Sequence, residues 1–261
     1  DPLWSRGLGD VYKRQRMFDP FGDFETAGYL RNELGLKDPE NIKIQEHLFF
    51  TANLQEAAEY LAGRSEITYE DFCKVHNILF FGFYPWAGQD RQTLGVARLV
   101  SKAGRVDFSE SGESERAVQY GLRLGNDSEY IARHPGEVMG LFAWGHPFLD
   151  GNGRTMVAVH TELMARAGLL VDWAASTKTD YLEALTQELE SPREGALDAY
   201  MLPLVLPLRR SHRWIDQIRE LSGLAGTNEE VGSDVTYAED DVEAQRRYLE
   251  KVKGRQYSIP D

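Results

Sequence analysis

Cysteine is nearly absent from this sequence. The 261 residues include one cysteine, Cys73, and a single thiol cannot close a disulfide within the chain. Cys73 lies among apolar residues at helical spacing, where a buried thiol is the expected state. A fold stabilised by internal disulfides is therefore excluded, and the composition suits a reducing cytoplasm, with secretion as an effector left open as an alternative.

Long apolar runs and basic residues are also scarce. We find no run of about 18 apolar residues, so the sequence predicts no membrane-spanning helix and no membrane partner. Lysine and arginine total 29 against 42 acidic residues, a net charge of −13. Such a charge argues against binding nucleic acid through broad neutralisation of its phosphates. With 42% hydrophobic residues, the chain can still bury a substantial core.

The two ends of the chain differ from its middle. Residues 1–16 lack a sustained hydrophobic period, and we expect them to be a non-native extension preceding a native start at Met17. They contain no apolar segment typical of a signal peptide. Residues 17–221 carry the periodic pattern of one domain. Residues 222–261 are polar and predict a linker, followed by a charged C-terminal helix around Ala238 to Val252 or by a solvated tail.

Apolar residues of the middle segment recur mainly at helical spacing, which predicts a mainly α fold. One short β-hairpin is expected, with strands at 99–101 and 105–108 joined by a turn. The predicted helices cover residues 29–34, 42–61, 68–80, 113–133, 135–145, 154–167, 178–190 and 194–207. The helical pattern of 113–133 is broken at 125–128.

Nine residues, His146-Pro-Phe-Leu-Asp-Gly-Asn-Gly-Arg154, combine a proton acceptor, a carboxylate, a glycine turn and a cation before a helix. Gly151 and Gly153 allow backbone N–H groups to converge on an anion, and the helix N-terminus adds partial positive charge. Arg154 can bind phosphate oxygens, and Asp150 can hold Mg²⁺. Asp-Gly and Asn-Gly are also ordinary turn dipeptides, but the histidine, aspartate and arginine at these offsets favour a polyphosphate site.

These residues resemble the signature of the Fic (filamentation induced by cAMP) family, His-x-Phe-x-Asp/Glu-Gly-Asn-Gly-Arg-x-x-Arg. Every position from His146 to Arg154 matches, whereas the final arginine falls on Val157. The resemblance extends to Tyr84-Pro-Trp-Ala-Gly88 and Leu197-Asp-Ala-Tyr200, and covers roughly residues 17–208. It implies a Fic-type helical bundle in which the hairpin forms a flap beside the active site.

The resemblance implies a protein nucleotidylyltransferase that moves AMP from ATP to a serine, threonine or tyrosine hydroxyl, with release of pyrophosphate. His146, with an ordinary pKa of about 6.5, would accept the hydroxyl proton. Asp150 would hold Mg²⁺, and the target protein would dock by strand addition on the flap at 99–108. Five residues are expected to bind the donor, the last of them at its nucleoside: Gly151, Asn152, Gly153, Arg154 and Tyr181.

Val157 is the one departure from the signature. Three residues after Arg154 it lies on the same helical face, where an arginine could reach the polyphosphate but valine can only pack. Weaker or differently oriented triphosphate binding follows, unless Arg91, Arg133 or Lys178 substitutes. The alternatives are a transferase with a different phosphorylated donor, an enzyme that removes AMP, and a protein-binding domain that has lost donor binding.

The family is often restrained by an inhibitory helix with Ser/Thr-x-x-x-Glu followed by Gly or Asn. This complete motif is absent from the sequence, so any restraint is expected from a small antitoxin-like partner. The related death-on-curing phosphotransferases carry a lysine in the loop, unlike Gly153-Arg154 here. His76 and His160 do not have zinc-ligand spacing, and we expect both to pack in the core.

Overall fold

The computed structural model describes residues 30–96, 99–102 and 106–209, together with residues 215, 218, 235–238, 246, 248–250 and 259 of the C-terminal segment. The structural statements below concern these residues. The predicted non-native extension at 1–16 and most of the predicted linker lie outside them.

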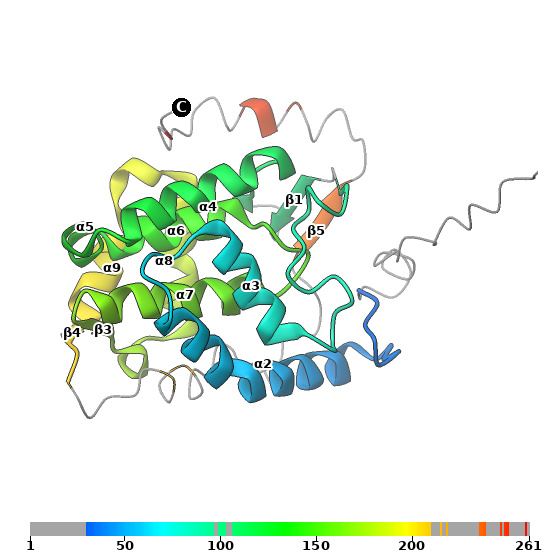
Figure 1. The fold of residues 1–261 in the computed structure, drawn as a ribbon. Coiled ribbons are helices and arrows are strands. Elements are labelled where there is room, and N and C mark those ends of the chain that lie inside the picture. The colour runs from blue at the N-terminus through cyan, green and yellow to red at the C-terminus, as the bar shows by residue number, and fades with distance from the viewer. Residues whose placement is uncertain are drawn as a thin grey trace, which may run out of the picture.

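Helices form the body of the protein (Figure 1). Helix α7 is central, because it contacts α2, α3, α5 and α6. Eleven of its fifteen residues are buried, as expected for a helix surrounded by others. None of the described helices has the length and apolar content needed to cross a bilayer. The helices are α2 (Pro39–Ala62), α3 (Tyr69–Phe80), α4 (Ser111–Gly125), α5 (Ser128–Arg133), α6 (Pro135–Gly145), α7 (Asn152–Arg166), α8 (Lys178–Glu190) and α9 (Ala196–Met201).

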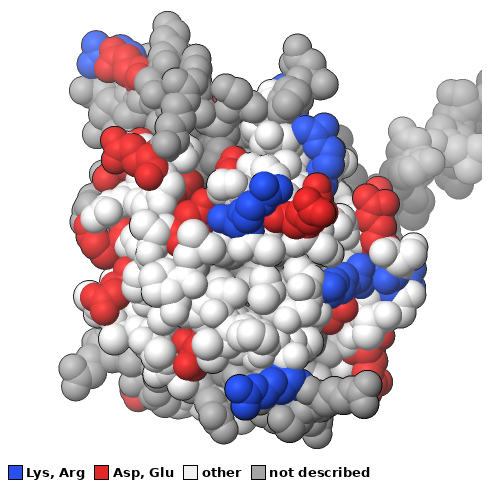
Figure 2. Space-filling model, turned by 90° about the vertical axis from the view of Figure 1, so that its left-hand side faces the viewer, with Lys and Arg blue, Asp and Glu red and all other residues white. Residues whose placement is uncertain are grey.

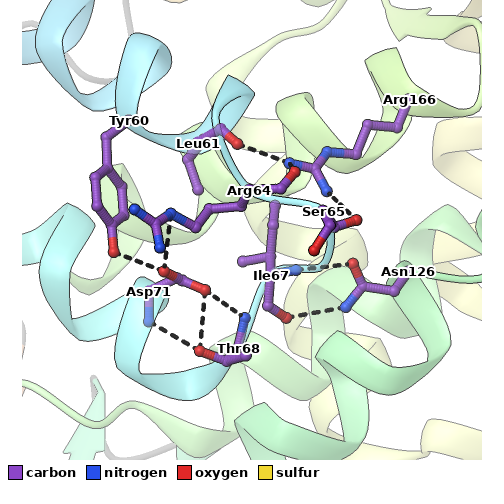
Figure 3. Close-up of polar contacts among 9 residues, drawn as sticks. All are labelled: Tyr60, Leu61, Arg64, Ser65, Ile67, Thr68, Asp71, Asn126 and Arg166. Atoms are coloured by element: carbon purple, nitrogen blue, oxygen red, sulfur yellow. Dashed lines mark hydrogen bonds and ion pairs between the residues drawn. The ribbon is translucent and has the colours of Figure 1, made fainter.

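Polar contacts hold the connection between α2 and α3 beside the C-terminal end of α7 (Figure 3). Thr68 and Asp71 form a reciprocal capping box that starts α3. Arg166, in the last turn of α7, donates to the carbonyl oxygens of Leu61 (2.7 Å) and Arg64 (3.1 Å). Leu61 lies in the last turn of α2, where a cation beside the backbone carbonyls is favourable. Helices α2 and α3 are thereby held against α7.

Helix α6 begins at Pro135, which suits the first turn of a helix. Its N-terminal N–H groups are capped from α9, because Asp198 accepts hydrogen bonds from the backbone of Gly136 (2.6 Å) and Glu137 (3.2 Å). The histidine before the helix, His134, also contacts this carboxylate (3.2 Å). Asp198, part of the downstream segment that resembles Fic proteins, therefore anchors the helix that leads to His146.

Two predicted helices are wrong in part. The short helix at 29–34 is not formed over its described residues, and the first described helix begins at Pro39. The helix predicted at 194–207 ends at Met201. Its remainder contains two prolines, which cannot donate backbone hydrogen bonds. Residues Val205–Pro207 instead form strand β4, which pairs antiparallel with β3 (Leu169–Val171).

The predicted hairpin is confirmed as β1 (Leu99–Lys102) and β2 (Val106–Asp107), paired antiparallel. A third strand, β5 (Val235–Ala238), was not predicted and pairs with the other edge of β1. The sheet order is β2-β1-β5. Ala238, expected at the start of a C-terminal helix, thus lies in a strand, whereas residues 246 and 248–250 are helical.

Described parts of the C-terminal region are buried. They are Tyr248, within the predicted helix or tail at 222–261, and Ile215 and Ile218, at the end of the predicted domain at 17–221. The Tyr248 hydroxyl accepts a hydrogen bond from the backbone N–H of Glu110 (3.0 Å), the residue that precedes α4. These described parts of the segment therefore pack against the helical domain.

Figure 2 shows the face that lies to the left in Figure 1. Its basic side chains are few and separated from one another, and several stand beside acidic ones, so the described residues of this face form no continuous basic surface. This arrangement agrees with the net charge of −13 and offers no broad footprint for nucleic acid on that side.

Candidate functional site

The loop from His146 to Gly151 connects α6 to α7 and carries the predicted site. His146 is the one described residue other than glycine with a positive φ, at 41°. This conformation is unfavourable for a residue with a side chain and persists only where the surroundings enforce it. It ends α6 and turns the chain toward α7.

Arg91 helps to hold the backbone of His146 in this conformation. Its side chain is completely buried, and its guanidinium donates to the carbonyl oxygen of His146 (2.9 Å) and to the carbonyl oxygen of Ser109 (2.9 Å). Its backbone N–H donates to the carbonyl oxygen of Pro147 (2.7 Å). Arg91 therefore holds the loop, and its buried guanidinium does not replace the arginine missing at position 157.

Arg133 does not fill that role either. It lies in α5, before the N-terminus of α6, and its Nε donates to the backbone of Glu129. The eleven residues of α6 separate it from His146, a length of about 16 Å at 1.5 Å per residue. Lys178 begins α8 and stays a prediction as a substitute.

The ring of His146 lies against the flap. It stacks on Phe108, immediately after β2, with ring centroids 3.8 Å apart and planes inclined by 19°. Only 9% of His146 is exposed. The flap therefore forms one wall of the site and fixes the plane of the imidazole.

Asp150 has a geometry that fits a magnesium ligand. One carboxylate oxygen accepts the N–H of Gly151 (2.6 Å), and the other lies 3.5 Å from the hydroxyl of Tyr84. The side chain is 47% exposed, so an ion could reach it from solvent. Mg²⁺ in nucleotide sites is often held by one or two carboxylates together with water and phosphate oxygens, and Asp150 could supply such a carboxylate.

Arg154 is less open than the sequence suggested. Its Nη2 atom lies 2.5 Å from a carboxylate oxygen of Glu46 and 3.9 Å from Asp150, and the side chain is 13% exposed. The guanidinium also lies over the ring of Phe80, 5.0 Å from its centre. One side of this arginine is thus bound to the protein, and only the remainder could contact a phosphate.

Glu46, in α2, was missed in the sequence. It is buried and also accepts a hydrogen bond from Tyr84 (3.0 Å). The available signal was its position midway between Ile42 and Phe50, at spacings of four that place it on the buried face of the helix. A buried carboxylate needs a cationic partner, which Arg154 provides.

The charges of Glu46, Asp150 and Arg154 shift one another's pKa values and that of Tyr84. Burial, with a smaller contribution from Asp150, raises the pKa of Glu46 from 4.5 to about 7, although Arg154 opposes the shift. Burial would lower the pKa of Arg154, but Glu46 and Asp150 reverse this and raise it, so the arginine stays charged. Burial and the neighbouring Glu46 also raise the pKa of Tyr84, which remains a neutral hydroxyl.

His76 is buried as expected, but it packs directly beneath the site. Its Nδ1 accepts the backbone N–H of Gly88 (2.8 Å). Because that nitrogen accepts, the neutral ring carries its proton on Nε2, which donates to the carbonyl oxygen of Asp150 (3.0 Å). Burial lowers the pKa of His76 to about 3, so the ring stays neutral. Its ring also stacks on Phe148 at 3.8 Å.

Asn152 and Gly151 shape the start of α7. The Asn152 amide accepts from the backbone N–H of Phe148 (2.9 Å) and donates to its carbonyl (2.8 Å), which closes the loop. Gly151 has φ of 76°, and a Cβ atom there would lie 2.5 Å from the ring of Phe80. None of the described side chains caps the N-terminus of α7. Its first N–H groups are therefore suited to an anion, whereas a contact of Asn152 or Gly153 with phosphate stays a prediction.

Val157 is buried in the hydrophobic core, as expected for a side chain that can only pack. Tyr181 lies edge-on to Trp173, with ring centroids 5.5 Å apart, and near Tyr200 at 6.4 Å. Burial raises the pKa of Tyr181. These contacts are aromatic packing, and the proposed role of Tyr181 at the nucleoside stays a prediction.

Two proteins named as adenylyltransferases are similar to this chain. Protein adenylyltransferase VbhT of Bartonella schoenbuchensis is 30% identical over 159 residues, which are 59% of this chain and 32% of VbhT. The chain thus spans about a third of that relative's length. The probable protein adenylyltransferase y4lH of Sinorhizobium fredii is 23% identical over 188 residues, 69% of this chain and 90% of y4lH.

Solved structures of Bartonella proteins share the fold. The N-terminal Fic domain of a VirB-translocated Bep effector from Bartonella quintana, with bound ADP, gives a TM-score of 0.57 at 18% identity, over 71% of this chain and 94% of that domain. BepC of Bartonella tribocorum, with bound AMPPNP, gives a TM-score of 0.55 at 18% identity, over 69% of this chain and 93% of the BepC chain. Residues 66–164, which include the flap and the whole loop from His146 to Arg154, match the model of the Fic/DOC family. The segment 66–164 therefore belongs to the Fic/DOC family, and the chain has the mainly helical Fic fold.

Proposed function

We propose that this chain is a protein nucleotidylyltransferase that transfers AMP from ATP to a serine, threonine or tyrosine hydroxyl of a target protein. One observation carries the proposal. A single connection between α6 and α7 presents His146, the half-exposed Asp150 and an N-terminus of α7 that no described side chain caps. The names of VbhT and y4lH, and the ADP and AMPPNP bound to two similar structures, support a nucleotide donor.

The reaction assigns one task to each part of this loop. The hydroxyl oxygen of the target attacks the α-phosphorus, and the imidazole of His146 accepts the hydroxyl proton. The bond from the α-phosphorus to the oxygen bridging to the β-phosphate breaks, and pyrophosphate leaves. The N–H groups at the start of α7 and the open side of Arg154 would bind the phosphates and stabilise their charge.

Mg²⁺ would be held by Asp150 and by phosphate oxygens, and would neutralise part of the donor's charge. The need for a cation follows from the cluster itself. Asp150 and Glu46 surround a single arginine, Arg154, so the site has no excess of positive charge when both carboxylates are ionised. A triphosphate would therefore enter most favourably as its magnesium complex.

The acceptor segment of the target would dock on the flap at 99–108. Phe108, which directly follows β2, stacks on His146. A strand bound on this flap would consequently lie near the proton acceptor. A small inhibitory partner acting in trans remains part of the proposal, because the sequence lacks the family's inhibitory motif.

Transfer of label from ATP tests the proposal. The purified chain is incubated with Mg²⁺, bacterial lysate and α-labelled ATP, GTP, CTP or UTP, and labelled proteins are detected on a gel. We expect labelling with ATP that is lost in His146→Ala, while the thermal midpoint of the variant stays near that of wild type. Equal labelling by both proteins would overturn the assignment of His146.

A second function is favoured by one specific observation. Val157 is buried and Arg154 is already paired with Glu46, so neither position of the signature offers a fully open arginine. A protein-binding domain without donor affinity would have this arrangement. Titration calorimetry with AMPPNP and Mg²⁺ separates the two functions, because the transferase requires binding and the binding domain predicts none.

A further inference from the structure

Strand β1 pairs over its whole length with a segment from the far C-terminal part of the chain. The four residues Leu99–Lys102 lie antiparallel to Val235–Ala238, and Figure 1 shows β5 beside β1. The hairpin partner β2 pairs only with Ser101 and Lys102. The longer pairing of β1 is therefore with β5 and not with its own hairpin.

The edge occupied by β5 has the properties of a peptide-binding edge. A two-stranded hairpin is marginal by itself, and an unpaired strand edge presents N–H and C=O groups to any extended segment. Val235, Thr236 and Tyr237 belong to the residue types that favour strands. The chain thus covers with its own segment an edge that would otherwise pair with another strand.

Other contacts keep this C-terminal segment beside the flap. The buried Tyr248 accepts the N–H of Glu110, two residues after the Phe108 that stacks on His146. Arg116, in α4, donates to the carbonyl oxygen of Ile259 (3.2 Å). Two described residues after β5, Tyr248 and Ile259, therefore contact α4 or the residue that precedes it.

We propose that the outer edge of β1 is a binding site for an extended peptide and that β5 is its resident occupant, which a peptide from another protein must displace. Backbone hydrogen bonds would provide most of the recognition, with β-branched and aromatic residues preferred. The consequence for catalysis rests on the proposed function: the acceptor segment of a target would gain this edge only when β5 leaves it.

The tether gives β5 a large advantage over a free peptide. A segment linked within the same chain acts at an effective concentration on the order of millimolar. If β5 occupies the edge at least about nine-tenths of the time, the apparent dissociation constant of a competing peptide is weakened at least about tenfold. Loss of β5 pairing should therefore tighten peptide binding by that factor.

The experiment uses the full chain with Thr236→Pro and Tyr237→Pro together. Successive N–H groups of a strand point to opposite sides, so one of these two substitutions removes a donor that faces β1. The probe is a fluorescein-labelled synthetic peptide with the sequence of residues 232–241, and its binding is followed by fluorescence anisotropy. Thr236→Val with Tyr237→Phe is the matched control, because both replacements favour strands.

We expect the proline variant to bind the peptide at least about tenfold more tightly than wild type, and the control to bind as wild type does. Equal affinity of wild type and the proline variant, including no binding by either, would overturn the proposal. A second variant, Thr236→Gly with Tyr237→Gly, weakens β5 without proline, and we expect its affinity for the peptide to lie between those of wild type and the proline variant. The assay contains no nucleotide, so it is independent of the labelling experiment that tests AMP transfer.

Discussion

The hydrogen bond from His76 to the carbonyl oxygen of Asp150 offers a sharp test of how the site is positioned. His76 makes two polar contacts, donating from Nε2 to Asp150 and accepting at Nδ1 from Gly88. Glutamine places a donor near Nε2, and asparagine places an acceptor near Nδ1. His76→Gln can therefore keep the bond to Asp150, whereas His76→Asn can keep the bond to Gly88.

Both substitutions should destabilise the fold to a similar extent. Each leaves one buried polar group without its partner, which costs about 1–3 kcal/mol, and each loses the ring that stacks on Phe148 at 3.8 Å. At roughly 2–4 °C per kcal/mol for a domain of this size, the thermal midpoints should fall by several degrees in both variants. Stability alone therefore does not separate them.

Activity should separate them, because only His76→Asn releases the backbone of Asp150. A displacement of about 1 Å at a reacting group can cost on the order of a hundredfold in rate. We expect His76→Asn to reduce AMP transfer about 10–100 times more than His76→Gln, measured as initial rates with labelled ATP below both thermal midpoints. Equal losses in the two variants would refute the assignment of His76 to Asp150.

Three further outcomes follow from the same geometry. Gly151→Ala should destabilise the fold by at least about 1–3 kcal/mol, because φ is 76° and the new Cβ would lie 2.5 Å from the ring of Phe80; an unchanged denaturation midpoint would contradict this. Arg91→Met should cost at least about 1–3 kcal/mol, because the buried carbonyl acceptors around the loop lose their donor; a loss below about 1 kcal/mol would contradict the role of Arg91 in holding the loop. Acidification from pH 7 to 5 should destabilise Glu46→Gln by about 2 kcal/mol more than wild type, as urea denaturation at both pH values would show; parallel pH dependence would contradict the shifted pKa of Glu46.

The pH dependence expected for Glu46→Gln follows from pKa shifts of opposite direction in buried histidines and in Glu46. Burial lowers the pKa of His76 to about 3 and of His160 to about 4, so the unfolded chain binds their protons first. The neutral rings stabilise the fold fully at pH values above the histidine pKa in the unfolded chain, about 6.5. As the pH falls from 7 to 5, the free energy of unfolding decreases by about 2 kcal/mol for each histidine. Glu46 has the opposite sign, because its pKa is raised to about 7. As the pH falls, Glu46 is protonated in the folded state before it is protonated in the unfolded chain. This raises the free energy of unfolding by about 2 kcal/mol between pH 7 and 5.

The parts of the site that are close in sequence could be predicted from it. Offsets of four and eight residues join His146, Asp150 and Arg154 into one pattern, and the glycines between them indicate the turn before α7. The helices themselves follow from apolar periodicity, as α3 and α8 illustrate. Local spacing was sufficient for these features because each depends on neighbours within one or two turns.

Features that depend on distant residues could not be predicted in this way. Glu46 meets Arg154 only because α2 packs on α7, and Arg91 reaches His146 across the fold. The pairing of β5 with β1 joins segments separated by most of the domain. Strand partners and buried ion pairs are set by tertiary packing, which no periodicity in a single segment encodes.

Two labelled forms of ATP test the central claim most directly. The chain is incubated with Mg²⁺ and lysate in parallel with ATP labelled at the α-phosphate and ATP labelled at the γ-phosphate. Nucleotidyl transfer predicts that a target protein acquires the α-label and not the γ-label, and that His146→Ala abolishes the signal. Acquisition of the γ-label would instead identify a phosphotransferase, and no label from either form would contradict transfer from ATP altogether.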